Sequence, residues 1–460
     1  MSQTGRSRNI SRAQNRFRGT KIDRQKSSAT EIAKEFIVLI LETSSVHGFS
    51  HIAAKRRHPI ENLFWFFMVL MGAYGAYFFA QSTLRRYSES PTVISLERNY
   101  KDWNTTFPSA TICPSTKIQP DLSEAMISKW FGKVDNTSEI VEWLDALARA
   151  NYENFDQLTI EDRIPSSMYL KVLTETAFKL SYVVSNSNSE SGTMIQTMTE
   201  RGICYTFNSV VAMYNNPEYW MNNDWAVNMS VNIFKGNPLE GDIFAQVMEL
   251  NSGYTVNIHS PFEVPDVSTV YQTSLANFYM SIDVTAMSTV STEETRSLST
   301  TQRKCRFLEE SNLKTTPVYS YNQCRSECRM MLAYKLCKCI PFFHRPIDGM
   351  AVCDVQGMKC LGQHKERLIK LKDERVNEDC KCLPPCNDVT YLGTNLKFGL
   401  LKYPRTRLKR DLFFTRSDLL VQLGGSASLC LGCSVLSFCE FFYLFTLRLA
   451  LFLRQKLRKR

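Results

Sequence analysis

Ten cysteines lie between residues 305 and 386, and thiols at this density either bind a metal ion or form disulfides. They are Cys305, Cys324, Cys328, Cys337, Cys339, Cys353, Cys360, Cys380, Cys382 and Cys386. A zinc site is disfavoured because the segment contains no C-x-x-C pair and only two histidines, His344 and His364. We therefore expect disulfides and no metal site.

The spacing of these cysteines predicts how they pair. Residues 320–337 and 361–378 have helical composition, and the Pro- and Gly-containing stretch between them predicts an antiparallel hairpin. Two cysteines four apart on a helix are about 6 Å apart, and two that are two apart on an extended segment are roughly 6.6 Å apart, so Cys324 and Cys328 match Cys380 and Cys382. Pairing from the inside of the hairpin outward gives Cys339–Cys353, Cys337–Cys360, Cys328–Cys380, Cys324–Cys382 and Cys305–Cys386. Cys113 and Cys204 remain to pair with each other, although so many cysteines allow other connectivities.

A second group of chemically informative residues lies in the apolar segment 419–447. A helix facing only lipid would not keep Gly424, Gly425, Ser426, Ser428, Gly432, Ser434 and Glu440. A carboxylate within a membrane faces a bundle interior or water, where Glu440 would attract cations. The alternative is simple helix packing, with a Glu440 side chain that reaches the interface. One helix cannot enclose a pore, so conduction would require several copies around an axis.

Two segments are apolar enough to hold such residues in a membrane. Residues 63–80 carry no charge, and residues 419–447 carry only Glu440. A membrane span needs about 20 apolar residues, and the alternative for each segment is a buried core helix. The first segment is not a signal peptide, because it starts 62 residues into the chain and no small-residue cleavage site follows it.

Basic residues flank both segments. Residues 1–58 contain 12 Lys/Arg against 4 Asp/Glu, and residues 448–460 contain 6 Lys/Arg and no acid. The excess of positive charge on the cytoplasmic side places both termini in the cytoplasm and residues 83–417 outside. Contact with anionic lipid, and not with nucleic acid, explains these basic ends, because each adjoins a span.

The outside region has mixed secondary structure. Strand-like alternation occurs in residues 109–113, 202–214, 226–234 and 254–260. Residues 138–150 and 168–180 are helical in pattern, so we expect a β-core with helical insertions. Sequons for N-glycosylation occur at Asn104, Asn136 and Asn228. The chain contains no H-E-x-x-H, G-x-S-x-G or Walker A motif, so we expect neither an enzyme nor a cofactor.

Several motifs in a fixed order resemble the degenerin/epithelial sodium channel family, and most of all its insect pickpocket branch. They are His47-Gly48, FPSATIC (107–113), GICYTFN (202–208), QRKCRF (302–307), CKCIPFF (337–343), CKCLPPC (380–386) and LLVQLGGSASLCLGCS (419–434) followed by Glu440. The resemblance covers nearly the whole chain. The family's thumb-domain disulfides, carried over by position, agree with the pairing given above.

The resemblance implies an α+β membrane protein of trimeric architecture, with a hand-shaped, disulfide-rich extracellular domain between two transmembrane helices. The corresponding segments are a cytoplasmic N-terminus (1–58), a first span (59–82), an extracellular domain (83–417) with its thumb at 305–386, a pore-lining span (418–447) and a basic cytoplasmic tail (448–460). The implied function is that of a sodium-selective channel subunit of the plasma membrane, gated by ligand or force, amiloride-sensitive, sensory or epithelial in an insect, and assembled as a homo- or heterotrimer.

The resemblance also assigns roles to single residues. Gly432-Cys433-Ser434 occupies the G-x-S selectivity position. The gating positions are His47, Gly48, Val421, Gly424 and Gly425. Val421 lies where bulky residues hold related channels open, and His47-Gly48 matches the motif that lines the inner pore. Glu440 is the expected pore acid.

Two departures from the family pattern stand out. Only 37 residues, 387–423, separate Cys386 from Gly424, and we expect this segment to hold much less than the pair of palm strands found in relatives. The alternative function is therefore a non-conducting accessory subunit of a heterotrimer. The second departure is Gln302, where vertebrate relatives often carry a Trp that touches the wrist.

Overall fold

The computed structural model describes residues 29–458 except 55–56, 133–136, 160–162, 187–192, 229–231, 240, 242, 277, 279, 348, 372–379, 396–398 and 403–405. The Asn136 sequon and most of the expected cytoplasmic N-terminus lie outside these residues. The chain forms two compact units, Met1–Glu89 with Phe414–Arg460 (the helical unit) and Ser90–Phe413 (the sheet unit). Each is described by itself.

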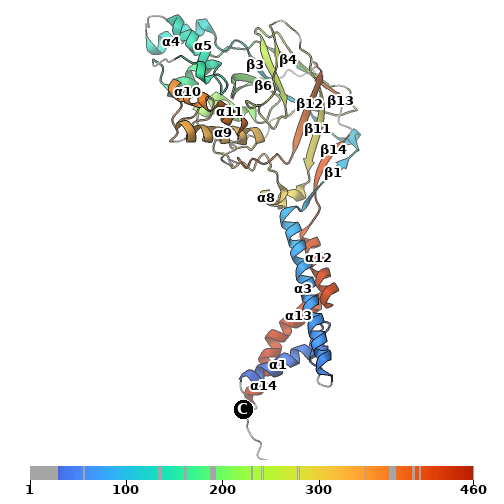
Figure 1. Cartoon of the computed structure of the whole chain (residues 1–460). Helices are drawn as coiled ribbons and strands as arrows, with labels where there is room; N and C mark the ends of the chain where they lie inside the picture. Colours follow the sequence, from blue (N-terminus) through green and yellow to red (C-terminus); the bar gives the residue numbers. More distant parts are fainter. Residues whose placement is uncertain are drawn as a thin grey trace, which may run out of the picture. The chain divides into compact units, whose positions relative to one another are not determined.

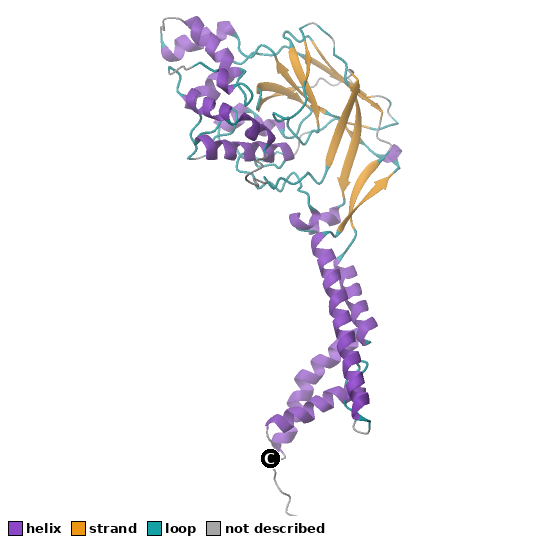
Figure 2. Ribbon diagram, viewed as in Figure 1, coloured by secondary structure: helices purple, strands orange, loops and turns teal. Residues whose placement is uncertain are grey.

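Figures 1 and 2 show the helices and strands of both units. The helices are α1 (Ala29–Thr43), α2 (Phe49–Ile52), α3 (Pro59–Glu89), α4 (Pro120–Phe131), α5 (Thr137–Ala148), α6 (Tyr169–Thr176), α7 (Pro217–Met221), α8 (Thr300–Arg303), α9 (Tyr321–Cys337), α10 (Val355–Gln363), α11 (Lys365–Lys370), α12 (Arg416–Leu431), α13 (Val435–Tyr443) and α14 (Leu449–Arg458). The strands are β1 (Thr92–Glu97), β2 (Thr105–Thr106), β3 (Ser109–Pro114), β4 (Val183–Asn186), β5 (Met194–Thr199), β6 (Gly202–Phe207), β7 (Lys235–Gly236), β8 (Ile243–Met248), β9 (Tyr254–His259), β10 (Gln272–Ser274), β11 (Asp283–Ser291), β12 (Asp388–Asn395), β13 (Gly399–Lys402) and β14 (Arg407–Leu412).

Two sheets organise the sheet unit. One has the strand order β1-β14-β11-β13-β8-β4, with β12 also paired to β11. The other has the order β10-β9-β3-β6-β5, in which every residue of β3 is buried. Both sheets contribute to one apolar cluster that includes Ile112, Phe207, Val256 and Val284. The expected β-core with helical insertions is therefore present.

Two of the expected strands differ from the structure. The strand predicted for residues 202–214 ends at Phe207, because Asn208 has a left-handed φ of 57° and its amide donates to the carbonyl of Phe107. Of residues 226–234, those described form no strand, and 229–231 lie outside the description.

The segment after Cys386 corrects a second expectation. It contains three strands, β12, β13 and β14, although we expected much less than a pair. β12 runs antiparallel to β11, and β14 is antiparallel to β1 and parallel to β11. The charged sequence RLKRDL (407–412) did not suggest a strand. β14 can contain these charged residues because all of its side chains are only half-buried.

The helices α9, α10 and α11 pack on a second apolar cluster that includes Leu332, Phe342, Met358, Leu361 and Leu368. The helix expected at 361–378 begins earlier and is divided. Asp354 accepts a hydrogen bond from the backbone of Gly357 and so starts α10 at Val355. α11 ends at Lys370 because Leu371 is left-handed, with φ 53°.

The helical unit contains the two segments expected to span a membrane. α3 has 31 residues and extends past the expected limit of 82, and the stretch Val435–Arg458 is the second one long and apolar enough to cross. The single helix expected over 418–447 is interrupted: α12 ends at Leu431 and α13 begins at Val435.

Candidate functional site

The interruption between α12 and α13 is built by Gly432 and Ser434. Gly432 has a left-handed φ of 64°, a conformation that costs other residues about 1 kcal/mol or more, and its N–H donates to the carbonyl of Ser428 at 2.8 Å. Ser434 caps α13 by accepting the N–H of Ser437, while the Ser437 hydroxyl accepts the N–H of Ser434 at 3.1 Å. The sequence Gly-Cys-Ser thus stops one helix and starts the next within three residues.

The loop that holds His47 and Gly48 packs against this interruption. His47 donates its backbone N–H to the carbonyl of Leu431 at 3.1 Å, which satisfies a carbonyl that the end of α12 leaves free. A Cβ on Gly432 would lie 2.2 Å from His47 Nδ1. Gly48 has φ 90°, and a Cβ there would lie 2.5 Å from Cγ2 of Val69 in α3. Both glycines are therefore needed for the loop, α3 and α12 to meet.

A polar chain continues from this loop to α13. Ser45 donates its backbone N–H to Glu440 Oε2 at 3.1 Å, and its hydroxyl lies 2.8 Å from that of Ser437. The structure therefore brings Glu440 to the loop before α3, where its carboxylate accepts a backbone hydrogen bond. No local sequence pattern indicates Ser45 or Ser437, whose roles depend on contacts across more than 390 residues.

α3 and α12 approach closely where α3 carries glycine. A Cβ on Gly72 would lie 2.6 Å from the carbonyl oxygen of Cys430, and one on Gly75 would lie 3.4 Å from its Sγ. Small residues permit such contacts between membrane helices. Beyond α13, the ring of Phe36 in α1 packs at a tilt against that of Phe452 in α14, with 5.3 Å between the ring centroids.

Three of the residues expected to gate are not part of this arrangement. Val421 is 72% exposed on α12, and apart from the neighbouring residues and backbone of α12 itself, no described atom lies within 4 Å of a Cβ built on Gly424 or Gly425. In the single chain, these positions present a free face of α12.

Comparison with known proteins identifies the family. The amiloride-sensitive sodium channel family model matches residues 40–397 and 393–444. The chain belongs to the amiloride-sensitive sodium channel family.

It is 22% identical over 457 residues to Pickpocket protein 19 of Drosophila melanogaster, covering 87% of this chain and 88% of that protein. It is also 21% identical to Pickpocket protein 28 of the same fly, over 90% of this chain and 79% of the relative. Sodium channel protein Nach of Drosophila ananassae is 22% identical, over 88% and 85%. These matches confirm the insect pickpocket-like branch.

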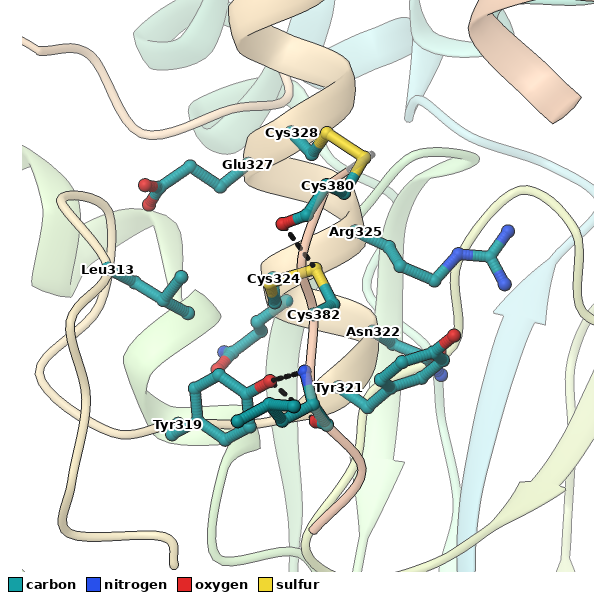
Figure 3. Close-up of a disulfide and its surroundings, with 12 residues drawn as sticks. Leu313, Tyr319, Tyr321, Asn322, Cys324, Arg325, Glu327, Cys328, Cys380 and Cys382 are labelled. Atoms are coloured by element: carbon teal, nitrogen blue, oxygen red, sulfur yellow. Dashed lines mark hydrogen bonds between the residues drawn. A yellow bond between two sulfur atoms is a disulfide. The ribbon is translucent and has the colours of Figure 1, made fainter. Parts of the chain in front are cut away.

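The sheet unit of this sodium channel family member contains six disulfides, in the pairs expected from the sequence. They are Cys113–Cys204, Cys305–Cys386, Cys324–Cys382, Cys328–Cys380, Cys337–Cys360 and Cys339–Cys353. Figure 3 shows two of them joining α9 to the segment Cys380–Cys382. Next to them, the Tyr319 hydroxyl donates to the carbonyl of Leu383 at 2.6 Å and accepts its N–H at 2.9 Å.

The remaining expected positions lie on the surface of the sheet unit. Asn104 and Asn228 are exposed, as glycosylation requires. Gln302 closes a capping box at the start of α8, where its side chain accepts the N–H of Ser299. Its role here is to start a short helix.

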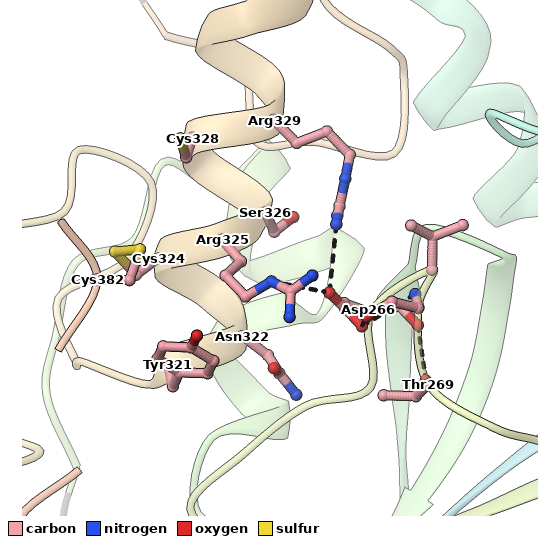
Figure 4. Close-up of polar contacts among 12 residues, drawn as sticks. Asp266, Thr269, Tyr321, Asn322, Cys324, Arg325, Ser326, Cys328, Arg329 and Cys382 are labelled. Carbon is pink, nitrogen blue, oxygen red and sulfur yellow. Dashed lines mark hydrogen bonds and ion pairs between the residues drawn. A yellow bond between two sulfur atoms is a disulfide. The ribbon is translucent and has the colours of Figure 1, made fainter. Parts of the chain in front are cut away.

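A buried ionic network on α9 was not expected from the sequence. Arg329 is fully buried and binds both carboxylate oxygens of Glu200 as well as Asp266 Oδ2 at 3.2 Å. Arg325 lies one turn before Arg329 and approaches the same Asp266 oxygen at 3.6 Å (Figure 4). Two cations thus face two carboxylates, as buried charges require.

Glu263 anchors the first turn of the same helix. Its carboxylate accepts the backbone N–H groups of Tyr321 and Asn322 at 2.8 and 3.0 Å and the Ser320 hydroxyl at 2.9 Å. Negative charge is favourable at a helix N-terminus. Burial nevertheless raises the pKa of Glu263 to about 7, with these hydrogen bonds opposing the shift.

Proposed function

We propose that this chain is a pore-forming subunit of a trimeric, sodium-selective cation channel of the plasma membrane, with both termini in the cytoplasm. The observation that carries the proposal is the interruption at Gly432–Ser434, together with the His47 loop hydrogen-bonded to it. A helix break leaves backbone carbonyls and hydroxyls without helical partners. Around a symmetry axis, three copies of such groups would form a narrow belt that replaces part of the hydration shell of an ion.

The strands β12 and β14 support conduction over the accessory role. The accessory alternative depended on a missing strand pair after Cys386. Because β14 pairs with both β1 and β11, the segment that leads to α12 is tied into the seven-stranded sheet. Movements of this sheet can therefore reach the second span.

The direct test is current through the full-length chain, expressed alone and together with related subunits. In Ser434→Leu, the larger apolar side chain should change the Na⁺/K⁺ permeability ratio or abolish current, because it replaces a hydroxyl at the proposed belt. The matched control is Ser88→Leu, near the C-terminal end of α3. There the serine hydroxyl donates to the backbone carbonyl of Arg85 in the same helix. Wild-type selectivity with normal current in Ser434→Leu would exclude this residue from the belt. Absence of current from the chain alone, together with current in the presence of related subunits that Ser434→Leu does not change, would favour the accessory role.

Gating and block are tested in the same cells. Val421 has a free face in the single chain, so a bulky replacement such as Val421→Phe should hold the assembled channel open and raise basal current. Equal basal current would mean that the gating position of relatives does not carry over. Inhibition of this current by amiloride would establish for this chain the drug sensitivity after which its family is named.

A further inference from the structure

A cavity of about 60 Å³ lies between the two large sheets of the sheet unit. β3 and β9 line it from the five-stranded sheet, and β8 lines it from the seven-stranded sheet. The connection after β8 and the residues just before β11 complete the lining. Protein cores seldom contain voids larger than one water molecule, which needs roughly 10–15 Å³. This cavity therefore has room for about four to six atoms of that size.

Two alanines, one from each sheet, leave this space open. Ala110 of β3 is 2% exposed and Ala245 of β8 is 3% exposed, and both line the cavity. Side chains two apart on a strand share a face, so Ala110 lies beside Ile112, and Ala245 lies beside Val247. These larger neighbours also line the cavity. A larger side chain at either alanine would occupy the space.

The lining is almost entirely apolar. Apart from Gln246, every lining residue belongs to the apolar cluster that the two sheets share. Among the described residues of the lining, none is Asp, Glu, Lys, Arg or His, and the Tyr254 hydroxyl donates to the carbonyl of Phe278 at 3.3 Å. An ordered water requires two to four hydrogen-bond partners, and cavities with apolar walls stay dry. A charged ligand would be buried without a counterion. The chemistry of the walls thus favours a neutral, apolar occupant.

One side of the cavity is closer to solvent than the other. Gln246, Leu250 and Met280 are half-buried, whereas Ile112 and Val256 on the inner side are buried. Methionine has an unbranched, flexible side chain, which can move aside to admit a small molecule. A ligand can therefore enter between half-buried residues without separating the two sheets.

We propose that this cavity binds a neutral aliphatic molecule of three or four carbon atoms that carries at most one hydroxyl group. The carbon chain lies beside Ala110 and Ala245, where it replaces empty volume with van der Waals contacts. A hydroxyl on the half-buried side keeps its contact with water, but a second hydroxyl would be buried without a partner. Because the ligand contacts residues of both sheets, its binding stabilises their packing. This ligand site is independent of whether the chain conducts.

The test is saturation-transfer NMR on the full-length chain in nanodiscs of deuterated lipid, with 1-propanol as the probe. Transfer from the protein to 1-propanol should saturate with a midpoint of about 1–10 mM, as expected for so small a ligand. Ethylene glycol has as many non-hydrogen atoms but two hydroxyls, and it should bind at least about tenfold more weakly.

A variant that fills the cavity locates the site. Ala245→Leu places a larger side chain in the space and should weaken 1-propanol binding by at least about tenfold. The matched control is Ala351→Leu, which adds the same atoms at an exposed position outside the cavity and should leave binding unchanged.

Three results would overturn the proposal. They are no saturable transfer to 1-propanol up to about 50 mM, ethylene glycol binding as tightly as 1-propanol, and unchanged 1-propanol binding in Ala245→Leu. If Ala245→Leu fails to fold, Ala110→Val decides instead, because it fills the cavity from the other sheet with a residue that suits a strand. Binding of 1-propanol at wild-type affinity in that variant would contradict the assignment.

Discussion

His47 donates its backbone N–H to the carbonyl oxygen of Leu431, across 3.1 Å. This bond joins the loop before the first apolar helix to the residue at which the second one stops. The imidazole of His47 lies so close to Gly432 that no side chain would fit at position 432. The loop and the interruption therefore form one structural feature. Two motifs more than 380 residues apart in sequence thus act on the same point of the helical unit.

Gly432→Ala should disrupt this feature. The added Cβ would meet His47 Nδ1 at 2.2 Å, and the left-handed backbone would cost about 1 kcal/mol or more. We expect a lower melting temperature of the purified protein and reduced or altered current. The matched control is Gly424→Ala, in the interior of α12, where no described atom outside α12 lies within 4 Å of the new Cβ. Helix propensity should make this control neutral or stabilising by up to about 1 kcal/mol. Equal changes in melting temperature for the two variants would contradict the role of the His47 contact.

The disulfides between α9 and Cys380–Cys382 should contribute strongly to stability. Replacing Cys324 and Cys382 together by serine removes one bridge without leaving a free thiol, and should cost about 2–5 kcal/mol. Surface expression should fall accordingly, as measured by biotinylation. The same double change at Cys339 and Cys353 removes a bridge that closes a loop of 14 residues instead of 58, so the entropic model predicts a smaller loss there. Peptide mapping without reduction checks both pairs directly, and free thiols at Cys324 and Cys382 would refute this one.

Sequence spacing was sufficient for these disulfides but not for other parts of the molecule. The pairing of Cys324 and Cys328 with Cys380 and Cys382 follows from the spacing of cysteines within two short segments, and this spacing can be read directly from the sequence. The network of Glu200, Asp266 and Arg329 joins residues 63 and 129 positions apart, and nothing local distinguishes these charges from exposed ones. β14 was missed for a related reason, since its half-buried, charged residues show no alternation of apolar and polar types. Tertiary contact, and not local pattern, determines both.

Removing Arg329 alone should be severely destabilising. Arg329→Met leaves two carboxylates buried without their main partner, and should lower the free energy of unfolding by about 3–5 kcal/mol. The triple variant Glu200→Gln, Asp266→Asn and Arg329→Met should recover part of this loss, because no buried carboxylate remains unpaired and Arg325, which loses Asp266, is partly exposed to water. Thermal unfolding of all three proteins measures the difference. If the triple variant is no more stable than Arg329→Met, the loss reflects packing and not charge.

The last prediction concerns Glu263, whose carboxyl holds the first turn of α9. Its pKa of about 7 lies above the ordinary value of 4.5, so between these values the folded protein binds its proton more tightly than the unfolded chain does. The contribution of this group to the free energy of unfolding is therefore largest below about pH 4.5 and falls as the pH rises through about 7. Buried His344, with its pKa lowered to about 3, has the opposite pH dependence, so the wild-type profile alone is not diagnostic.

The informative quantity is the difference in unfolding free energy between wild type and Glu263→Gln, which cannot ionise. Relative to this variant, wild type should lose stability between about pH 4.5 and 7, with a slope of at most about 1.4 kcal/mol per pH unit. A difference that does not change with pH would mean that Glu263 keeps an ordinary pKa, its three hydrogen bonds outweighing its burial.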